Sequence, residues 1–432
     1  MKKVLIITYY WPPSGGSGVQ RCLYFVKYLR DFGYEPVVYT VANGEYPAID
    51  ETLAKEIPDG VEVIKSEIWE PYQLYKKFTG QKKEQRLKPL VVTEKKEKQF
   101  AHKISTWIRG NFFIPDARKF WIKPSIEKLT DYLQQNPVDL ILSSSPPQSV
   151  HLIALALKKK FQLPWVADFR DPWTKISYYD DLMLTPWADN KHKRLEKEVL
   201  TAADVATTVS WSCQQGFESI VPRKIEVITN GFDDTIQMPK LAPDSNLFTI
   251  SYTGTLSRDR NPIKIWEGLQ ELIIERPELA GKLKIRFIGD IDDSVFDSFE
   301  QLGICQIAER VGYVKHHQVF EYLASSDLLL LIGIPNDKGV LTGKLFEYLF
   351  SKKPILSIGP NGGDIETILA ETKAGVNVDF DEKDPFKKAL KNFIDRPKGA
   401  QPTNLTVLNK FTRKNLTGQL AGYFDRLLGV VS

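Results

Sequence analysis

The feature of this sequence that most constrains its fold is a run of five aliphatic residues, 328–332, that is followed by a short amphipathic segment and a second apolar run, 355–358. A continuous apolar run of this length predicts a strand that is buried on both faces of a parallel sheet. Between the runs, the pattern predicts a helix that begins near Gly343, with Thr342 as its N-cap, and ends before Pro354. Strand, helix and strand in this order indicate an open α/β sheet, which binds ligands at the carboxyl ends of its strands.

The predicted helix has an apolar and a polar face. The apolar stripe consists of Leu345, Phe346, Leu349 and Phe350, and the other face consists of Lys344, Glu347, Tyr348 and Ser351. Lys344 and Glu347 are three residues apart, so a surface ion pair is one interpretation. However, a lysine in the first turn opposes the helix dipole, and it would instead add to an anion site at the helix start. If Glu347 accepted the hydroxyl groups of a ribose, the two residues together would bind a nucleotide.

Length and composition indicate a two-domain protein whose cysteines are free thiols. A chain of 432 residues is too long for one ordinary core. The net charge of +4 is small, so any basic feature must be local. Three widely spaced cysteines fit a reducing compartment and exclude a disulfide framework or a cysteine-based zinc site. Residues 4–7 are too short for a signal sequence, and no run reaches the roughly 18–20 apolar residues of a membrane span. We therefore expect a cytoplasmic location.

A glycine-rich loop follows the first predicted strand, residues 3–9, and precedes a helix over about 19–32. Gly15 and Gly16 lie in this loop, where backbone can approach a phosphate or a sugar hydroxyl. The glycine spacing is not the G-x-G-x-x-G of dinucleotide-binding proteins, which disfavours a dehydrogenase. A plain turn is the alternative interpretation.

The composition of the chain becomes strongly basic over residues 72–103. This stretch holds ten lysines and arginines against three glutamates, and aromatic residues flank it. One interpretation is a solvated insertion in the domain, over about 70–110. The other is a basic and aromatic patch, residues 76–103, that lies on an anionic membrane surface. Nucleic acid is disfavoured as a partner because no RNA- or DNA-binding signature accompanies the charge.

Charged residues collect at the end of another predicted strand, residues 165–167. We expect Asp168, Arg170 and Asp171 to be catalytic, because ligand chemistry usually gathers at the carboxyl ends of parallel strands. A local ion-pair network that shapes the loop is the alternative. His151, at the start of the preceding helix, is a further catalytic candidate, although a histidine in that place is often only a cap.

The α/β pattern occurs twice, which predicts two doubly wound Rossmann-like domains that face a central cleft. We expect a first domain over 1–234, a linker over 235–247 and a second domain over 248–405. A final helix, predicted from 406 to 428 within the segment 406–432, would pack back on the first domain.

The two predicted domains together with five segments resemble a GT-B glycosyltransferase, most closely the retaining family 4 type of bacterial surface-polysaccharide assembly. The segments are 11–18, 225–233, 252–256, 312–314 and 343–348. The resemblance covers essentially the whole chain.

The resemblance implies that a sugar moves from a nucleotide-sugar, UDP- or GDP-linked, to an acceptor hydroxyl with retention of the anomeric configuration. Its donor-binding residues would be Lys344 for the diphosphate, Glu347 for the ribose, and Arg258 or Arg260, with Thr342 and Gly343 at the helix start and Gly15 and Gly16 in the other domain. It implies neither a cofactor nor a metal, and we interpret Asp290 and Asp292 as helix caps. The acceptor would be a glycan on a polyprenyl lipid.

Two positions depart from the family pattern. Gly339 lies where a glutamate is frequent, and Thr255 lies where an arginine often follows the glycine. Arg260 could substitute for that arginine. Two alternatives stay open. A nucleotide-sugar epimerase of the same fold would bind a similar donor, and the missing glutamate leaves room for a non-catalytic binding or scaffold module.

Overall fold

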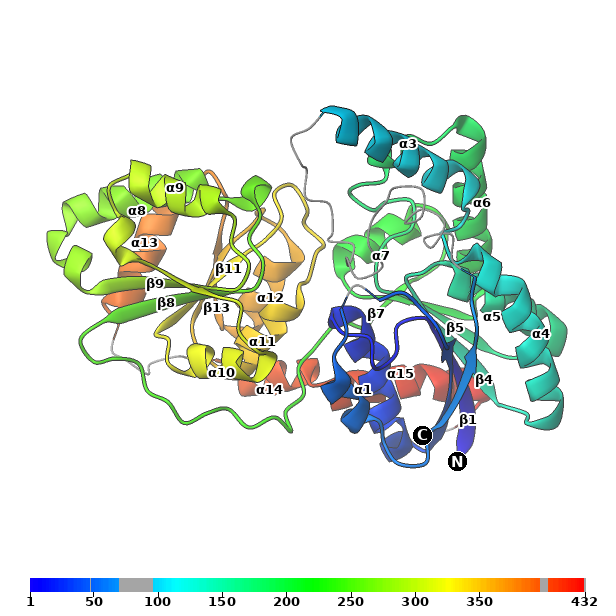
Figure 1. The fold of residues 1–432 in the computed structure, drawn as a ribbon. Coiled ribbons are helices and arrows are strands. Elements are labelled where there is room, and N and C mark those ends of the chain that lie inside the picture. The colour runs from blue at the N-terminus through cyan, green and yellow to red at the C-terminus, as the bar shows by residue number, and fades with distance from the viewer. Residues whose placement is uncertain (47, 70–95, 397–402, 431–432) are drawn as a thin grey trace. The chain divides into compact units, whose positions relative to one another are not determined.

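The structure is a computed structural model that describes residues 1–46, 48–69, 96–396 and 403–430 (Figure 1). The chain forms two compact units. The N-terminal unit consists of Met1–Ile228 and Leu416–Ser432, and the C-terminal unit consists of Thr229–Asn415. The first unit therefore ends six residues before the predicted domain boundary, and its sequence resumes at the C-terminus. Residues 70–95, which include most of the predicted basic segment, lie outside the described residues.

The N-terminal unit contains a seven-stranded parallel sheet with the order β3-β2-β1-β4-β5-β6-β7. Its strands are β1 (Lys2–Thr8), β2 (Tyr34–Val41), β3 (Glu62–Ser66), β4 (Leu140–Ser145), β5 (Trp165–Phe169), β6 (Val205–Thr208) and β7 (Glu226–Val227). The helices are α1 (Ser17–Leu29), α3 (Lys96–Phe112), α4 (Lys119–Gln135), α5 (Ser149–Phe161), α6 (Pro186–Ala202) and α7 (Trp211–Glu218), with short helices η1 (Arg30–Phe32), η2 (Glu51–Glu56) and η3 (Asp180–Leu182).

Both faces of this sheet are covered, which explains why β1 carries apolar side chains on both of its faces. In β1, Leu5 and Ile7 pack into the cluster on one face, whereas Val4 and Ile6 pack into the cluster on the other. Leu420, near the C-terminus, belongs to the second cluster. Its helix, α15 (Arg413–Leu428), thus contributes apolar side chains to the core of the N-terminal unit.

The C-terminal unit contains a six-stranded parallel sheet with the order β10-β9-β8-β11-β12-β13. Its strands are β8 (Phe248–Thr253), β9 (Leu283–Ile288), β10 (Ala308–Gly312), β11 (Leu328–Ile332), β12 (Ile355–Ile358) and β13 (Gly375–Val378). Its α-helices are α8 (Ile263–Glu275), α9 (Asp293–Gln301), α10 (His316–Ala324), α11 (Gly343–Ser351), α12 (Asp364–Thr372), α13 (Lys383–Ile394) and α14 (Leu405–Leu408). The short helices are η4 (Arg258–Arg260), η5 (Pro277–Gly281), η6 (Cys305–Ile307) and η7 (Asn409–Phe411).

The two sheets confirm the predicted fold class of two doubly wound Rossmann-like domains. Each has its first strand beside its fourth, so the order of connection reverses at that pair. Ligands of such sheets bind at this point of reversal, beyond the carboxyl ends of the strands.

Two local predictions are wrong. The final helix is not continuous, because α14 ends at Leu408 and α15 begins at Arg413. Tyr348 is not on a polar outer face: it is fully buried, and its hydroxyl accepts from the backbone N–H of Thr253 at 2.9 Å. A tyrosine can be buried in this way because its one polar atom finds a partner at the end of β8.

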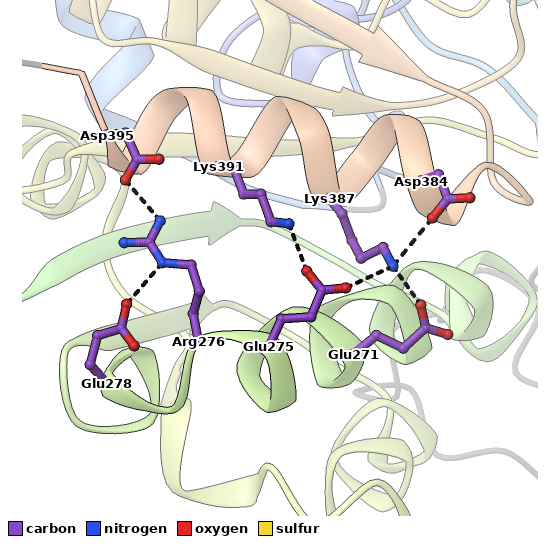
Figure 2. A network of polar contacts seen from close by, with 8 residues as sticks. All are labelled: Glu271, Glu275, Arg276, Glu278, Asp384, Lys387, Lys391 and Asp395. Atoms are coloured by element: carbon purple, nitrogen blue, oxygen red, sulfur yellow. Dashed lines mark hydrogen bonds and ion pairs between the residues drawn. The ribbon is translucent and has the colours of Figure 1, made fainter.

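Surface charges join α8 to α13 in the C-terminal unit (Figure 2). The Lys387 ammonium lies 2.8 Å from Glu271 and 3.3 Å from Glu275, and Lys391 lies 2.6 Å from Glu275. Hydrogen bonds from Lys383 and then Lys387 lower the pKa of Glu271 to about 2. This cluster ties together two helices that cover one face of the sheet.

No helix within the described ranges has both the length and the hydropathy needed to cross a lipid bilayer.

Candidate functional site

The polar groups of the C-terminal unit converge where β8 and β11 lie side by side. The chain leaves β8 through Gly254 and Thr255, and α11 begins ten residues beyond Gly333, after the loop that follows β11. This brings Lys344, in the first turn of α11, to the end of β8, although the two are about ninety residues apart in the sequence.

Lys344 is held against Tyr252. Its ammonium donates to the Tyr252 hydroxyl at 2.8 Å and to the Thr255 carbonyl at 3.4 Å, and it lies 4.4 Å from the centre of the Tyr252 ring. Burial raises the pKa of Tyr252 to about 12. The phenol therefore stays protonated, donating to the Thr255 carbonyl at 2.6 Å while it accepts from Lys344.

Gly254 makes room for this lysine. Its φ is +94°, and a Cβ at this position would lie 2.3 Å from Lys344 Cε and 2.7 Å from its Nζ. Glycine is thus needed here for two reasons, the left-handed backbone and the close approach of a side chain.

Arg260 is the second cation of the site. Its Nε donates to the carbonyl of Gly333 at 3.0 Å, another nitrogen donates to the carbonyl of Ile332, and a third lies 3.5 Å from the Thr255 carbonyl. The guanidinium therefore caps the carboxyl end of β11 and reaches Thr255, the position where the family often has an arginine.

The charge of Arg260 disfavours the charged form of Lys344. Burial, and then the nearby charge of Arg260, lower the pKa of Lys344 to about 7, and Glu347 offsets only part of this shift. A lysine whose ordinary pKa is about 10.4 is thus half neutral near physiological pH. An anion bound between Lys344 and Arg260 would relieve this repulsion.

The start of α11 adds backbone donors. Thr342 occupies the N-cap position, as predicted, but its hydroxyl makes no capping bond, and this buried oxygen has no partner among the described residues. Gly343 opens the helix, and a Cβ there would meet nothing within 4 Å. The first amides of a helix carry partial positive charge, so this end of α11 favours an anion.

Glu347 lies one turn deeper and does not pair with Lys344. The surface ion-pair interpretation therefore does not describe this helix. Instead, Glu347 Oε1 lies 2.9 Å from Nε2 of His316, the first residue of α10. Both side chains keep solvent access, at 27% for Glu347 and 54% for His316.

The structure separates the two predicted arginines. Arg258 is 79% exposed and lies 3.8 Å from Asp292, away from the contacts that Arg260 makes. Asp292 caps α9 by accepting from the Ser294 amide at 3.0 Å, in line with its interpretation as a cap. No group of three or more His, Cys, Asp or Glu side chains in the described parts of the chain is arranged to hold a metal.

In the N-terminal unit, Asp168 is a buried structural carboxylate. Arg21 binds both of its oxygens, at 2.7 and 2.9 Å, and Ser144 and Thr207 each donate to it at 2.7 Å. Burial acts to raise the pKa of Asp168, but Arg21 and the two hydroxyls outweigh it and hold that pKa below its usual range. Asp168 is 1% exposed. This geometry favours the ion-pair alternative over direct contact with a substrate.

His151 is likewise part of the core. It is the third residue of α5, not its cap, and it is fully buried with its ring centre 4.3 Å from that of Phe169. Its Nδ1 lies 2.8 Å from the Ser143 hydroxyl. Burial lowers the pKa of His151 to about 3, so it is neutral at physiological pH.

Arg170 fixes the glycine-rich loop. It donates to the carbonyls of Gly18, Ser145 and Pro146, which ties the first turn of α1, directly after the loop, to the end of β4. Gly16 has φ +92° at the start of α1, and the Gly15 amide donates to the Ala48 carbonyl at 2.8 Å. Hydrogen bonds from Arg170 and to Ala48 therefore fix the conformation of the loop.

Asp171 is the predicted catalytic residue that reaches open space. It lines a cavity of about 250 Å³ in the N-terminal unit. Loss of contact with water raises the pKa of the Asp171 carboxyl, and the charge of Arg170 opposes that shift.

Sequence reasoning missed most of the cavity lining. Polar groups there come from Arg109, Asp116, Arg118, Tyr178, Tyr179 and His192. His192 Nδ1 accepts from the Trp173 indole at 3.1 Å and its Nε2 lies 3.4 Å from the Gly110 carbonyl, an arrangement that fits a neutral ring protonated at Nε2. These residues come from separate helices and loops, so no spacing in the sequence marks them. The only signal was the aromatic and basic character of the region around 107–121.

Comparison with known proteins indicates a family for part of the chain and a fold for the whole of it. Residues 83–235 match the sequence model of Glycosyltransferase Family 4. The resemblance to family 4 GT-B glycosyltransferases is confirmed. No curated protein sequence matches the chain.

Solved structures share the GT-B fold over the whole chain at low identity. A glycosyltransferase from Rickettsia africae ESF-5 superposes with a TM-score of 0.64 at 14% identity, covering 100% of this chain and 99% of that one. A lipopolysaccharide outer core galactosyltransferase in its apo form gives 0.59 at 13%, covering 98% and 99%. A structure described as trehalose-6-phosphate from E. coli bound with UDP-2-fluoro glucose gives 0.59 at 11%, covering 99% of each chain. At these identities the likeness establishes the fold, while glycosyl transfer is supported by the family match.

Proposed function

We propose that this GT-B chain is a retaining glycosyltransferase that moves a sugar from a UDP- or GDP-linked donor to an acceptor hydroxyl. The observation that carries the proposal is the pair of cations at the end of β8 and β11. Lys344 and Arg260 both reach the Thr255 carbonyl, at 3.4 and 3.5 Å, and the lysine has a pKa of about 7. Such a site is built for an anion that arrives with the ligand.

The donor diphosphate would lie against Lys344, Arg260 and the first amides of α11. As the bond from the sugar to the diphosphate breaks, negative charge grows on the leaving phosphate, and fixed cations and helix-start amides stabilise that charge. Glu347, held by His316 at 2.9 Å, would accept the ribose hydroxyls. A match to glycosyltransferases, together with a galactosyltransferase and a UDP-sugar complex among the similar folds, supports this donor class.

The acceptor would bind in the cavity of the N-terminal unit. Its lining combines the Asp171 and Asp116 carboxylates with Arg109, Arg118 and tyrosines. Such a mixture suits a sugar bearing a phosphate, because carboxylates accept from hydroxyls and arginines bind phosphate oxygens. We propose a lipid-linked glycan of cell-surface polysaccharide assembly as the acceptor, and a cytoplasmic location with peripheral membrane contact.

The test is calorimetric titration with UDP, GDP and ADP. We expect one nucleotide to bind and Lys344→Ala to lose at least about tenfold in affinity, since a charge-assisted contact is worth about 1.5–3 kcal/mol. Lys388→Ala, a change at an exposed lysine of α13, is the matched control and should bind as the wild type does. Absence of binding to all three nucleotides would contradict the donor site and favour a scaffold role.

A product assay separates transfer from epimerisation. With a nucleotide-sugar donor, a transferase gives free nucleotide in step with a glycosylated acceptor. An epimerase would instead release free sugar without need of an acceptor, and a non-catalytic module would bind the nucleotide and give neither product.

A further inference from the structure

Helix α11 places a lysine and a glutamate within reach of each other, yet each has a different partner. Lys344 and Glu347 are three residues apart, a spacing at which the two side chains can form an ion pair. Instead, Lys344 Nζ donates to the Tyr252 hydroxyl at 2.8 Å, and Glu347 Oε1 lies 2.9 Å from His316 Nε2. An ionised carboxylate only accepts, so the hydrogen of the second contact belongs to His316 Nε2.

Packing between α10 and α11 fixes His316 beside Glu347. His316 and Phe320 lie one turn apart on α10, and Phe350 lies one turn beyond Glu347 on α11. The rings of Phe320 and Phe350 meet edge to face with their centres 6.1 Å apart, and the His316 ring lies 5.4 Å from that of Phe320. Figure 1 shows α10 beside α11, with which it is in contact. The apolar pair holds the helices together, so position 316 stays in place without the hydrogen bond.

The Glu347 carboxylate acts on Lys344 even from its place beside His316. Burial, and then the charge of Arg260, lower the pKa of Lys344 to about 7, and the charge of Glu347 opposes that shift. An opposite charge favours the charged form more strongly as it comes closer. If Glu347 turned from His316 toward Lys344, the lysine would bind its proton more tightly. It would also gain an internal counter-ion that competes with an anionic ligand.

Stability is a poor explanation for the contact between His316 and Glu347. The two side chains are 54% and 27% exposed, and contacts between such groups add little to the stability of a fold. The consequence of the contact is therefore the direction in which the carboxylate points. Its remaining lone pairs can accept from other donors.

We propose that His316 is a positioning residue that holds the Glu347 carboxylate away from Lys344. Lys344 then remains available to an anion, and Glu347 remains available to hydroxyl groups. If the ligand is a nucleoside diphosphate, His316 helps the protein to prefer ribose over 2′-deoxyribose, because it fixes the group that accepts the ribose hydroxyls. This last step rests on the proposed function, whereas the effect of His316 on Lys344 does not.

The experiment is an NMR titration of the full chain, free of nucleotide, with lysine side chains labelled with carbon-13. Lys344→Met assigns the Lys344 signal. His316→Leu, which keeps an apolar side chain against Phe320, should raise the proton affinity of Lys344 about tenfold or more. In His316→Gln the amide can donate in place of the ring, so Lys344 should titrate as in the wild type. His317→Leu, at the exposed neighbouring residue, is the matched control and should also leave the titration unchanged.

Two outcomes would overturn the proposal. One is an unchanged titration of Lys344 in His316→Leu, since a histidine that served only the fold would alter thermal unfolding and not this proton affinity. The other is an equal change in His316→Gln and His316→Leu, because the hydrogen bond to Glu347 would then not be the cause.

Calorimetric titration with UDP, GDP and their 2′-deoxy forms tests the choice of sugar. We expect the wild type to bind the ribose form of one nucleotide at least about tenfold more tightly, His316→Leu to lose most of that preference, and His316→Gln to keep it. An equal preference in the wild type and His316→Leu would overturn the ribose step. If no nucleotide binds, the proposed function fails, while the Lys344 titration still decides the role of His316, so the two failures are distinguishable.

Discussion

Tyr252 contacts the Lys344 ammonium in two ways: its hydroxyl accepts a hydrogen bond from Nζ at 2.8 Å, and its ring centre lies 4.4 Å from Nζ. Neither partner is an anion. Tyr252 therefore orients the lysine without supplying a counter-charge, so an anionic ligand can favour the charged form of Lys344. Burial, and then the charge of Arg260, lower the pKa of Lys344 to about 7.

Binding of a nucleoside diphosphate should be accompanied by proton uptake above pH 7. In the free protein Lys344 loses its proton as pH rises through about 7, and an anion restores it by favouring the charged form. Affinity should therefore fall with rising pH, by at most about tenfold per pH unit for this one group. Calorimetry at pH 8 in two buffers of different ionisation enthalpy measures the uptake. Equal heats in both buffers would contradict it, and Lys344→Met should bind weakly without proton uptake.

Gly254→Ala should weaken nucleotide binding by displacing Lys344. The added Cβ would lie 2.3 Å from Lys344 Cε, and alanine at a φ of +94° adds about 1 kcal/mol or more of backbone strain. Gly303→Ala is the control, because Gly303 has a φ of +68° but nothing within 4 Å of the new methyl group. We expect thermal unfolding to shift in both variants, and nucleotide affinity to fall only in Gly254→Ala. Equal affinities in the two variants would exclude a positioning role for Gly254.

Asp168→Asn should destabilise the N-terminal unit by about 3–5 kcal/mol, because it leaves the Arg21 guanidinium buried without its counter-charge. The pKa of Asp168 is lower in the folded protein than in the unfolded chain, so its stabilisation is complete above its ordinary pKa and is lost as pH falls toward the folded value. Denaturant unfolding measures the loss. Asp131→Asn, at an exposed aspartate of α4, should cause little change, and a small effect at both positions would show that Asp168 is dispensable for folding.

Lys387→Met should lower the melting temperature at low salt, because Lys387 lies within 3.3 Å of carboxylates of Glu271, Glu275 and Asp384 (Figure 2). The effect should shrink in molar salt, which screens exposed charge pairs. It should persist in mild acid, since the pKa of Glu271 is about 2 and its contribution is lost only as pH falls toward that value. Lys388→Met is the neutral comparison, and an effect of equal size at high salt would show that packing, not charge, is responsible.

Much of the C-terminal unit could be predicted from local sequence. A continuous apolar run identified β11, and a run interrupted only by Ser357 identified β12, because strands buried on both faces need no polar alternation. Thr342 and Gly343 marked the start of α11, and Lys344 stood out because a lysine opposes the dipole at a helix start. Its contact with Tyr252 could not be predicted in this way, since it joins residues that are about ninety positions apart.

The N-terminal unit shows where sequence reasoning failed. Asp168, Arg170 and Asp171 form one charged cluster in the sequence, yet the structure gives them three different surroundings: a buried ion pair, a set of backbone carbonyls and an open cavity. Residues adjacent on a strand point to opposite faces, and the loop beyond it turns freely, so neighbours in sequence need not share an environment.

The sequence by itself determined the two doubly wound domains and the helix start that carries Lys344, because strand periodicity, capping and helix dipoles act over a few residues. Only the tertiary structure decided which charges are buried, which are paired and which face a cavity. Burial and pairing depend on residues brought together from distant elements, and the free energy of a charge depends on that whole environment.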